Sequence, residues 1–532
     1  MIRISKCWLL CSVLLVSPIA AQSTPRRGGT LVLAAASDLQ QLNSLVNADA
    51  QTGEVIRHML FLPLVRLGAD LQPVPALART WQWIGDTAVV FHLRRDVYWH
   101  DGRRTTAHDA VFTITRAGDT LSAYPGGDAI SHLTLAQAID SFTLRIRLLP
   151  RRDPLHGLTE LAIMPRHHLE AVPAAQLRQA AFNKQPVGNG PFRFVSQRAN
   201  DRWVFQANAA FPAELGGPPY IERVVWRVIP ENSAQVTELR TGAVDLIMAA
   251  RAEQLPELDA RPDLRAIVKP SQRYTMIAWN GARAPLDQPA VRRALALALD
   301  RARMIELLRH GYAQVAVGPI PPTHWAFDPR VSPLPFDSAQ ARRLLAQAGY
   351  LDRDGDGRLE SAAGKPLEIE IKIAANNAFN RDVAEMVRAD LARMGVRIVP
   401  RPVDFATLID DISSVQRNFE GAFLVFETDL QLNLKDAFHS DALGGPYQSA
   451  SYSNPQLDRL LERAAAARTI KGARPLWSEV QRILRDDQPW TFLWYAPELF
   501  VLRERVRGVQ MDMRGTLVNL PRWWLDAAPG NE

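Results

Sequence analysis

The chain has 532 residues, which is too long for one hydrophobic core and indicates about three domains. Hydrophobic residues make up 47% of it and charged residues 22%, the balance of an ordinary soluble globular protein. The formal net charge is +6, but the arginines are spread along the whole chain without a basic block, which excludes nucleic acid as the target.

The first 21 residues have the order of a secretory signal peptide. A basic segment with Arg3 and Lys6 precedes an apolar run over residues 8–16, and small residues follow, ending at Ala21. The apolar run is much shorter than a membrane-spanning helix, which needs about 20 residues. We therefore expect cleavage after Ala21 and export of the mature protein.

Both cysteines, Cys7 and Cys11, lie within this segment, so the mature chain is expected to contain none. That excludes a disulfide framework, a thiolate metal site and a cysteine nucleophile. Cys11 lies inside the apolar run and lacks the small residue that precedes the cysteine of a lipoprotein signal. We expect a free, soluble product without a lipid anchor.

The first elements of the mature chain are a buried strand, a helix and a β-rich region. Continuous apolar runs or apolar–polar alternation predict strands over residues 30–36, 88–94 and 142–148. One helix is predicted over residues 52–61 and another over 106–116. Thr106 and Asp109, three residues apart, have the spacing of a capping box at the start of the second helix.

Farther along the chain, predicted strands and helices alternate, which indicates mixed α/β domains with parallel strand pairs. Strands are predicted over residues 224–229, 244–248, 367–373 and 396–399. Helices are predicted over residues 233–240, 287–310, 338–348 and 381–394. Gly395 follows the last of these helices at the position where a C-cap glycine is expected.

A series of short motifs, taken in order, resembles family 5 of the extracellular solute-binding proteins that serve ABC importers. The densest match is a strand ending in Trp99-His-Asp-Gly102, followed by a capped helix that begins with Ala107-His-Asp-Ala-Val111. Further matches are Val187-Gly-Asn-Gly-Pro-Phe192, Trp279-Asn280, Pro289–Leu295 with Leu299-Asp-Arg301, Gln347–Tyr350 and Tyr452-Ser-Asn454. The resemblance extends over nearly the whole mature chain.

The resemblance implies an α/β, periplasmic-binding-protein-like fold of class II, with two lobes that close on a ligand. The larger lobe I is expected to be discontinuous, over residues 22–65, 187–279 and 488–532. It is expected to carry an extra β-rich subdomain over residues 66–186. Lobe II is expected over residues 280–487.

The function that the resemblance implies is capture of a peptide in the cleft between the lobes and its delivery to the membrane permease of an ABC importer. The protein would be a periplasmic monomer without cofactor or enzymatic activity. A non-peptide solute, such as a metal chelate or an oligosaccharide, is an alternative ligand. An exported hydrolase is a further alternative, although the sequence contains no GxSxG elbow, P-loop or GxGxxG motif.

The stretch Phe423–Leu430 lies where peptide-binding relatives carry an acid that pairs with the α-amino group, but it lacks their tryptophan. The resemblance implies that Glu427 or Asp429 supplies this carboxylate, because a desolvated ammonium without a partner is costly. Polar contacts from lobe I are expected from Ser37, Asp38, Asn43 and Asn189. The two glycines beside Asn189 are expected to let the backbone approach the ligand closely. Aromatic residues that either line the cleft or pack in the core are Tyr274, Trp279 and Tyr447.

An Asp/Gly-rich segment matches the first half of a calcium loop. Asp352, Asp354 and Asp356 occupy the first ligand positions, but Ala363 stands where the bidentate glutamate would be. A turn that leads into the strand at 367–373 explains the same residues. A structural calcium ion remains the alternative.

Two histidine-containing segments superficially resemble metal or acid–base sites. The first contains His100, Asp101, His108 and Asp109, and a turn followed by the predicted helix cap is the simpler interpretation. His167 and His168 are adjacent, so we expect them not to face one site. No metal centre is expected from these residues.

Overall fold

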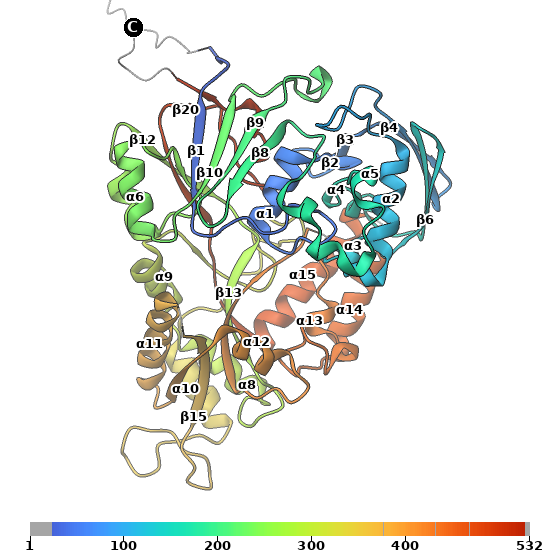
Figure 1. Ribbon diagram of the computed structural model, residues 1–532. Coiled ribbons are helices and arrows are strands. Elements are labelled where there is room, and N and C mark those ends of the chain that lie inside the picture. Colours follow the sequence, from blue (N-terminus) through green and yellow to red (C-terminus); the bar gives the residue numbers. More distant parts are fainter. Residues whose placement is uncertain (1–23, 376, 431, 468, 527–532) are drawn as a thin grey trace, which may run out of the picture.

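The computed structural model describes residues 24–375, 377–430, 432–467 and 469–526 (Figure 1). The predicted signal peptide, with both cysteines, lies outside these residues. Among the described helices, none combines the length and the apolar character needed to cross a membrane. The described chain forms two lobes, each built on one large sheet, and lobe I carries an additional small sheet.

The sheet of lobe I has seven strands in the order β12-β19-β11-β1-β10-β9-β8. These strands are β1 (Thr30–Ala35), β8 (Phe192–Arg198), β9 (Arg202–Ala207), β10 (Arg223–Val228), β11 (Leu246–Ile247), β12 (Leu264–Lys269) and β19 (Glu498–Arg503). β1 pairs in parallel with both β10 and β11, and α6 (Asn232–Thr241) connects those two strands. The predicted β-α-β unit is therefore confirmed here.

The β-rich subdomain is an antiparallel sheet in the order β4-β5-β7-β6. Its strands are β4 (Ala78–Ile84), β5 (Ala88–Leu93), β6 (Leu133–Asp140) and β7 (Thr143–Leu148). Helix α2 (Ala107–Gly118) packs its buried residues against this sheet. The Thr106 N–H donates to Asp109 Oδ2 at 2.9 Å, which confirms the predicted capping box.

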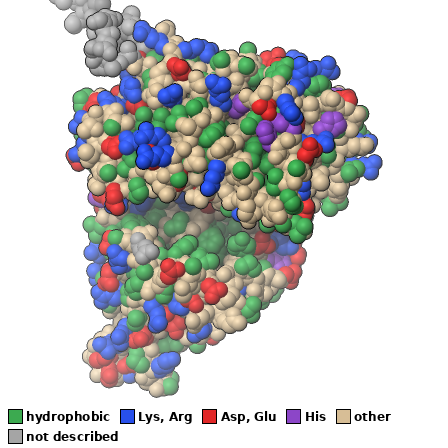
Figure 2. Space-filling view, viewed as in Figure 1, with side chains coloured by type: hydrophobic (Ala, Val, Ile, Leu, Met, Phe, Trp, Pro, Cys, Tyr) green, Lys and Arg blue, Asp and Glu red, His purple; other side chains and the backbone are tan. Residues whose placement is uncertain are grey.

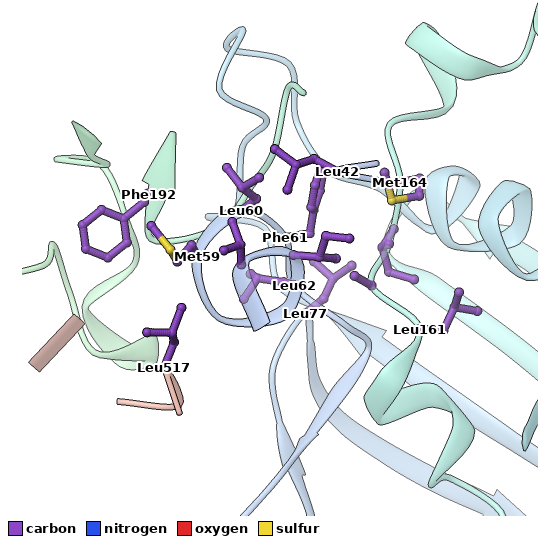
Figure 3. Packing of buried hydrophobic residues seen from close by; sticks show 14 of the residues in the cluster. Leu42, Met59, Leu60, Phe61, Leu62, Leu77, Leu161, Met164, Phe192 and Leu517 are labelled. Atoms are coloured by element: carbon purple, nitrogen blue, oxygen red, sulfur yellow. The ribbon is translucent and has the colours of Figure 1, made fainter. Parts of the chain in front are cut away.

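One continuous core joins the subdomain to lobe I (Figure 3). At its centre the chain passes from α1 (Ala50–Val55) into a π-helical turn (Ile56–Leu60) and on to Phe61 and Leu62. Leu77, Leu161 and Met164 of the subdomain and Phe192 of β8 surround this segment. Smaller elements of this body are β2 (Val65–Leu67), β3 (Pro73–Pro75), α3 (Gly127–Ile130), α4 (Gly157–Glu160), α5 (Arg166–Leu169), α7 (Leu255–Asp259), β20 (Val506–Arg507) and β21 (Trp524–Leu525).

The sheet of lobe II has six strands in the order β14-β18-β13-β17-β15-β16. They are β13 (Arg273–Trp279), β14 (Gln314–Val315), β15 (Glu368–Ala374), β16 (Arg397–Val403), β17 (Gly421–Glu427) and β18 (Trp490–Tyr495). One face is covered by α8 (Pro289–Leu297), α9 (Arg301–Arg309), α10 (Ser338–Gln347) and α11 (Ala378–Ala392). The other face is covered by α12 (Phe405–Ser413), α13 (Lys435–Phe438), α14 (Pro455–Ala466) and α15 (Ile470–Asp487).

The single helix predicted over residues 287–310 is wrong: the structure has two helices, α8 and α9. The break falls at Asp300, whose side chain accepts a hydrogen bond from the Arg303 N–H and thereby caps α9. The apolar residues keep a helical spacing through this break, so the sequence pattern did not indicate that a new helix is capped at Asp300.

The chain crosses between the two large sheets twice, after β12 and after β18. The crossing segments are residues 270–272 and 496–497, and the Ser271 hydroxyl joins them by donating to the Ala496 carbonyl at 2.7 Å. The boundaries expected at 279/280 and 487/488 therefore need correction, because β13 and β18 both lie in the lobe II sheet. Strand pairing, which the sequence does not display, decides the lobe to which each strand belongs.

Candidate functional site

A hollow separates the two lobes, and hydrophobic side chains are prominent on its lower wall (Figure 2). β1, β10, β11 and β12 all run in one direction, and the chain leaves β12 directly for lobe II. The carboxyl ends of these strands therefore face the cleft, the edge at which ligands of open α/β sheets bind.

Two of the predicted site residues, Ser37 and Asp38, follow β1 at this edge. The Ser37 hydroxyl is exposed and donates to Gln51 Oε1 at 3.2 Å. Asp38 accepts hydrogen bonds from Trp203 Nε1 at 2.6 Å and from the Asn200 N–H at 2.8 Å. Asp38 thus ties the β8–β9 turn to the cleft edge, whereas Ser37 keeps an accessible hydroxyl.

The opposing edge belongs to lobe II and contains the two predicted acids. β17 is buried over its first four residues and becomes exposed toward Glu427, its last residue. Glu427 pairs with Arg273 at 3.1 Å, and both side chains are about half exposed, at 58% and 45%. Asp429 follows at an exposed position and accepts from the Leu432 N–H. The exposed ion pair between Glu427 and Arg273 is weak, so the Glu427 carboxylate can leave Arg273 and bind a ligand at little cost in free energy.

Arg57, in the π-helical turn of lobe I, is a cleft residue that the sequence did not single out. It pairs with Glu160 at 3.0 Å, and the two side chains are 27% and 39% exposed. The Glu160 carboxylate raises the pKa of Arg57, burial opposes this, and Glu54 and Glu427 raise the pKa further. Glu427 belongs to lobe II, and its carboxylate is paired there with Arg273 and not with Arg57.

A second set of contacts connects the subdomain with lobe II. The Arg152 guanidinium lies 4.9 Å from the centre of the Trp325 ring and donates to the Ala464 carbonyl at 3.3 Å. Burial lowers the pKa of Arg151, while Asp153 and Asp429 raise it. These residues close one side of the cleft with cationic and aromatic groups.

The structure places Asn43 and Asn189 in the core and not at a ligand surface, which corrects both predictions. Asn43 is 0% exposed and donates to Asn183 Oδ1 at 3.0 Å. Asn189 is 1% exposed; its Oδ1 accepts from the Leu62 N–H at 2.9 Å and its Nδ2 donates to Thr105 Oγ1 at 3.3 Å. Buried amides with these partners hold loops together.

The glycines beside Asn189 also have a different role from the predicted one. A Cβ at Gly188 would lie 2.0 Å from the Leu60 carbonyl oxygen, and one at Gly190 would lie 2.5 Å from the Met59 carbonyl oxygen. The N–H groups of Asn189 and Gly190 both donate to the Leu60 carbonyl, at 3.0 and 2.8 Å. The close approach is therefore to the π-helical turn that carries Arg57, and not to a ligand.

Of the three aromatic candidates, two pack in the core of lobe II. Tyr274 is 4% exposed and lies against Phe426, Trp490 and Phe492. Trp279 is 0% exposed and donates from Nε1 to Thr491 Oγ1 at 2.8 Å. Tyr447, at 60% exposure, remains accessible.

Two histidines, His100 and His324, anchor loops in the neutral state. His100 Nε2 lies 3.1 Å from the Gly190 carbonyl, while its Nδ1 accepts from the Gly188 N–H. His324 has the same arrangement, with Nε2 near the Leu430 carbonyl and Nδ1 accepting from the Ala326 N–H. Burial lowers the pKa of each imidazole to about 4. Protonation of Nδ1 would also remove the acceptor of the backbone N–H.

We predict a loss of stability on mild acidification. The unfolded imidazoles bind protons below pH about 6.5 and the folded ones only near pH 4, so the free energy of unfolding falls between these values. For His324, which is 3% exposed, the contribution is about 3 kcal/mol. Urea unfolding midpoints measured across this pH range check the prediction. A His324→Gln variant should show a shallower pH dependence, and an unchanged slope would contradict the assignment.

The aspartates of the calcium-like segment form a hydrogen-bonded turn. Asp352 accepts from the N–H groups of Gly355 and Gly357, at 2.8 and 3.1 Å, and Asp354 accepts from the Asp356 N–H at 3.1 Å. One carboxylate oxygen of each aspartate and one of Glu360 lie within 4.8 Å of one another. The turn explains the segment, and these hydrogen bonds do not require a cation.

The expectation that His167 and His168 would not face one site is wrong. Both Nε2 atoms lie near the same carboxylate oxygen, Asp101 Oδ2, at 2.7 and 3.1 Å. The helix α5 is only four residues long, and imidazole side chains are long enough to converge on a carboxylate placed between them. The prediction was wrong because it assumed that neighbouring residues of a regular helix must point their side chains to different sites.

Comparison with known proteins gives consistent results along the chain. The model of "Bacterial extracellular solute-binding proteins, family 5 Middle" matches residues 72–437. The oligopeptide-binding protein AppA of Bacillus subtilis is 26% identical over 507 residues, covering 94% of this chain and 92% of that protein. Heme-binding protein A of Haemophilus influenzae is 26% identical over 460 residues, covering 82% and 81% of the two chains.

Solved structures agree with the fold. The structure of B. subtilis AppA in complex with a nonapeptide has a TM-score of 0.78 at 25% identity and covers 95% of this chain and 100% of that one. NikA of Brucella suis in complex with Fe(III)-EDTA has a TM-score of 0.83 at 18% identity, covering 94% and 100%. The periplasmic-binding-protein-like α/β fold expected from the sequence is confirmed. Together with the family match, these results show that the chain belongs to family 5 of the bacterial extracellular solute-binding proteins.

Proposed function

We propose that this protein is the substrate-binding component of an ABC importer, which captures a peptide between its lobes and presents it to the membrane permease. In this proposal it is a periplasmic monomer, exported after cleavage behind Ala21 and without a lipid anchor. It performs no chemistry on the ligand. Closure of the lobes on the peptide distinguishes the loaded from the empty state for the permease.

The observation that carries the proposal is that groups of opposite charge lie on the two lobes at the cleft. Glu427 and Asp429 are exposed at the lobe II edge, and Arg57 of lobe I keeps 27% of its side chain exposed. A peptide is a zwitterion, so its ammonium group fits the carboxylate edge and its carboxylate fits the arginine side. Strand ends and exposed loops supply backbone groups that can bond the ligand main chain without regard to its sequence.

The relatives support the peptide as ligand. AppA of B. subtilis is named an oligopeptide-binding protein, and its solved complex contains a nonapeptide. The peptide transport periplasmic protein SapA of Salmonella typhimurium is 27% identical over 507 residues. These names apply to those proteins, and the shared fold and coverage motivate the same assignment here.

A non-peptide ligand is the second candidate. The stretch Phe423–Leu430 lacks the tryptophan of peptide-binding relatives, and the residues that precede Glu427 are aliphatic or aromatic. A relative of equal identity, 26%, is named a heme-binding protein. An extended apolar wall, as in Figure 2, also suits a flat hydrophobic chelate.

A thermal-shift screen of the mature protein tests the proposal. Peptides of two to nine residues are compared with their N-acetylated forms, with haem as a further arm. A ligand present at about 100 times its Kd should raise the free energy of unfolding by about 2.7 kcal/mol. We expect free-amine peptides to raise the melting temperature more than acetylated ones. A shift with haem alone would favour the second candidate, and recovery of cleaved peptide would refute a purely binding role.

A further inference from the structure

A group of three metal-ligating side chains lies on the β-rich subdomain of lobe I, apart from the residues assigned to the ligand cleft. Asp101 belongs to the turn that follows β5, and His167 and His168 belong to α5, 66 and 67 residues farther along the chain. Their side chains are 29%, 16% and 38% exposed, respectively. An ion from solvent can therefore reach all three.

The donor atoms already converge. His167 Nε2 and His168 Nε2 lie 2.7 and 3.1 Å from Asp101 Oδ2, and all three ligand atoms lie within 4.8 Å of one another. Two ligands on one tetrahedral zinc ion, each about 2.1 Å from the metal, are roughly 3.4 Å apart. Small side-chain rotations would open enough space for an ion between the present hydrogen-bond partners.

The surroundings hold the three side chains in place. Asp101 Oδ1 accepts from the Arg103 N–H at 3.1 Å, so Oδ2 is the oxygen turned toward the histidines. The His167 ring packs against the buried Trp99 with centroids 6.2 Å apart, and the His168 ring packs against Phe182 at 6.0 Å. Ligands held in this way lose little freedom when they bind a metal.

We propose that Asp101, His167 and His168 bind one divalent transition-metal ion of the Zn²⁺ or Ni²⁺ class. Two imidazoles and one carboxylate form a donor set that prefers these ions over Ca²⁺ and Mg²⁺, and it leaves a coordination position for water or an external ligand. The bound ion joins α5 to the turn after β5 and stabilises this part of the molecule. It is distinct from any ion carried as a chelate in the cleft.

Calorimetric titration of the untagged, chelator-treated mature protein with Zn²⁺ tests the site, with Mg²⁺ as the hard-ion control. We expect one Zn²⁺ per chain and an increased melting temperature. The double variant His167→Ala/His168→Ala should bind Zn²⁺ at least about 10-fold more weakly and lose the thermal shift. Asp101→Asn keeps a hydrogen-bond acceptor for the histidines but should also weaken binding. His92→Ala, on the exposed side of β5, is the matched control and should bind like the wild type.

Three results would overturn the proposal. One is the absence of saturable Zn²⁺ binding by the wild-type protein. Another is undiminished binding by the double variant, which would place the ion elsewhere, for example at the aspartates of the calcium-like turn. The third is equal loss in the His92→Ala control. Circular dichroism of each metal-free variant confirms that the comparison is made between folded proteins.

Discussion

Replacement of Gly188 with alanine is expected to destabilise the protein by about 3 kcal/mol or more. The added Cβ would lie 2.0 Å from the Leu60 carbonyl oxygen and 3.0 Å from His100 Cε1. The obstructing atom belongs to the backbone, and the same carbonyl accepts hydrogen bonds from Asn189 and Gly190, so the loop cannot move without losing them. The urea midpoint and the melting temperature measure the loss.

Gly118, the last residue of α2, provides the matched control. A Cβ at Gly118 would meet nothing within 4 Å, so Gly118→Ala should leave the stability unchanged or raise it slightly. If Gly188→Ala were as stable as Gly118→Ala, the tight packing of this loop on the π-helical turn would be refuted. Since that turn carries Arg57, a folded but displaced loop should also weaken ligand binding.

Removal of the two acids at the lobe II edge is expected to abolish the preference for a free peptide amino group. The double variant Glu427→Gln/Asp429→Asn retains the shape of both side chains and removes their charge. Hydrogen bonds to charged groups contribute about 1.5–3 kcal/mol, so affinity for free-amine peptides should fall by roughly 10- to 100-fold. Affinity for N-acetylated peptides should change little. Calorimetry on both peptide forms measures the difference.

Glu368→Gln is the control for charge removal within the same sheet. Glu368 begins β15, which runs parallel to β17, so it lies at the sheet edge opposite Glu427 and pairs there with Arg397 at 2.9 Å. This variant should bind peptides like the wild type. The single variants at Glu427 and Asp429 then show which acid receives the ammonium group. Unchanged affinity in the double variant would remove both residues from the site.

Local signals in the sequence predicted most elements of the fold. The capping box at Thr106 and Asp109 and the β-α-β alternation around α6 depend on neighbouring residues, and the structure confirms them. The predicted lobe boundaries differ from those of the structure, because β13 pairs with β17 and β18, which lie far away in the chain. The sequence does not show which strands pair. The break at Asp300 was missed because an N-cap within an apolar pattern is hidden until the backbone turns.

The predicted site was less accurate, for a physical reason. The position of Glu427 within its motif predicted that it lies near the cleft. Such a position does not tell whether a polar side chain is exposed or buried. Asn189 and Trp279 lie in matching motifs and are nevertheless buried, with partners 84 and 212 residues away. Arg57 carried no local signal, because its ion-pair partner, Glu160, lies far away in the chain.

Hydrogen–deuterium exchange of the mature protein, with and without a bound peptide, tests most directly whether the ligand is held between the lobes. We predict slower exchange in two segments together, residues 54–62 of lobe I and residues 421–430 of lobe II. The strand β6 of the subdomain should be unaffected. Protection in only one lobe, or in neither of these segments despite measured binding, would contradict capture in the interdomain cleft.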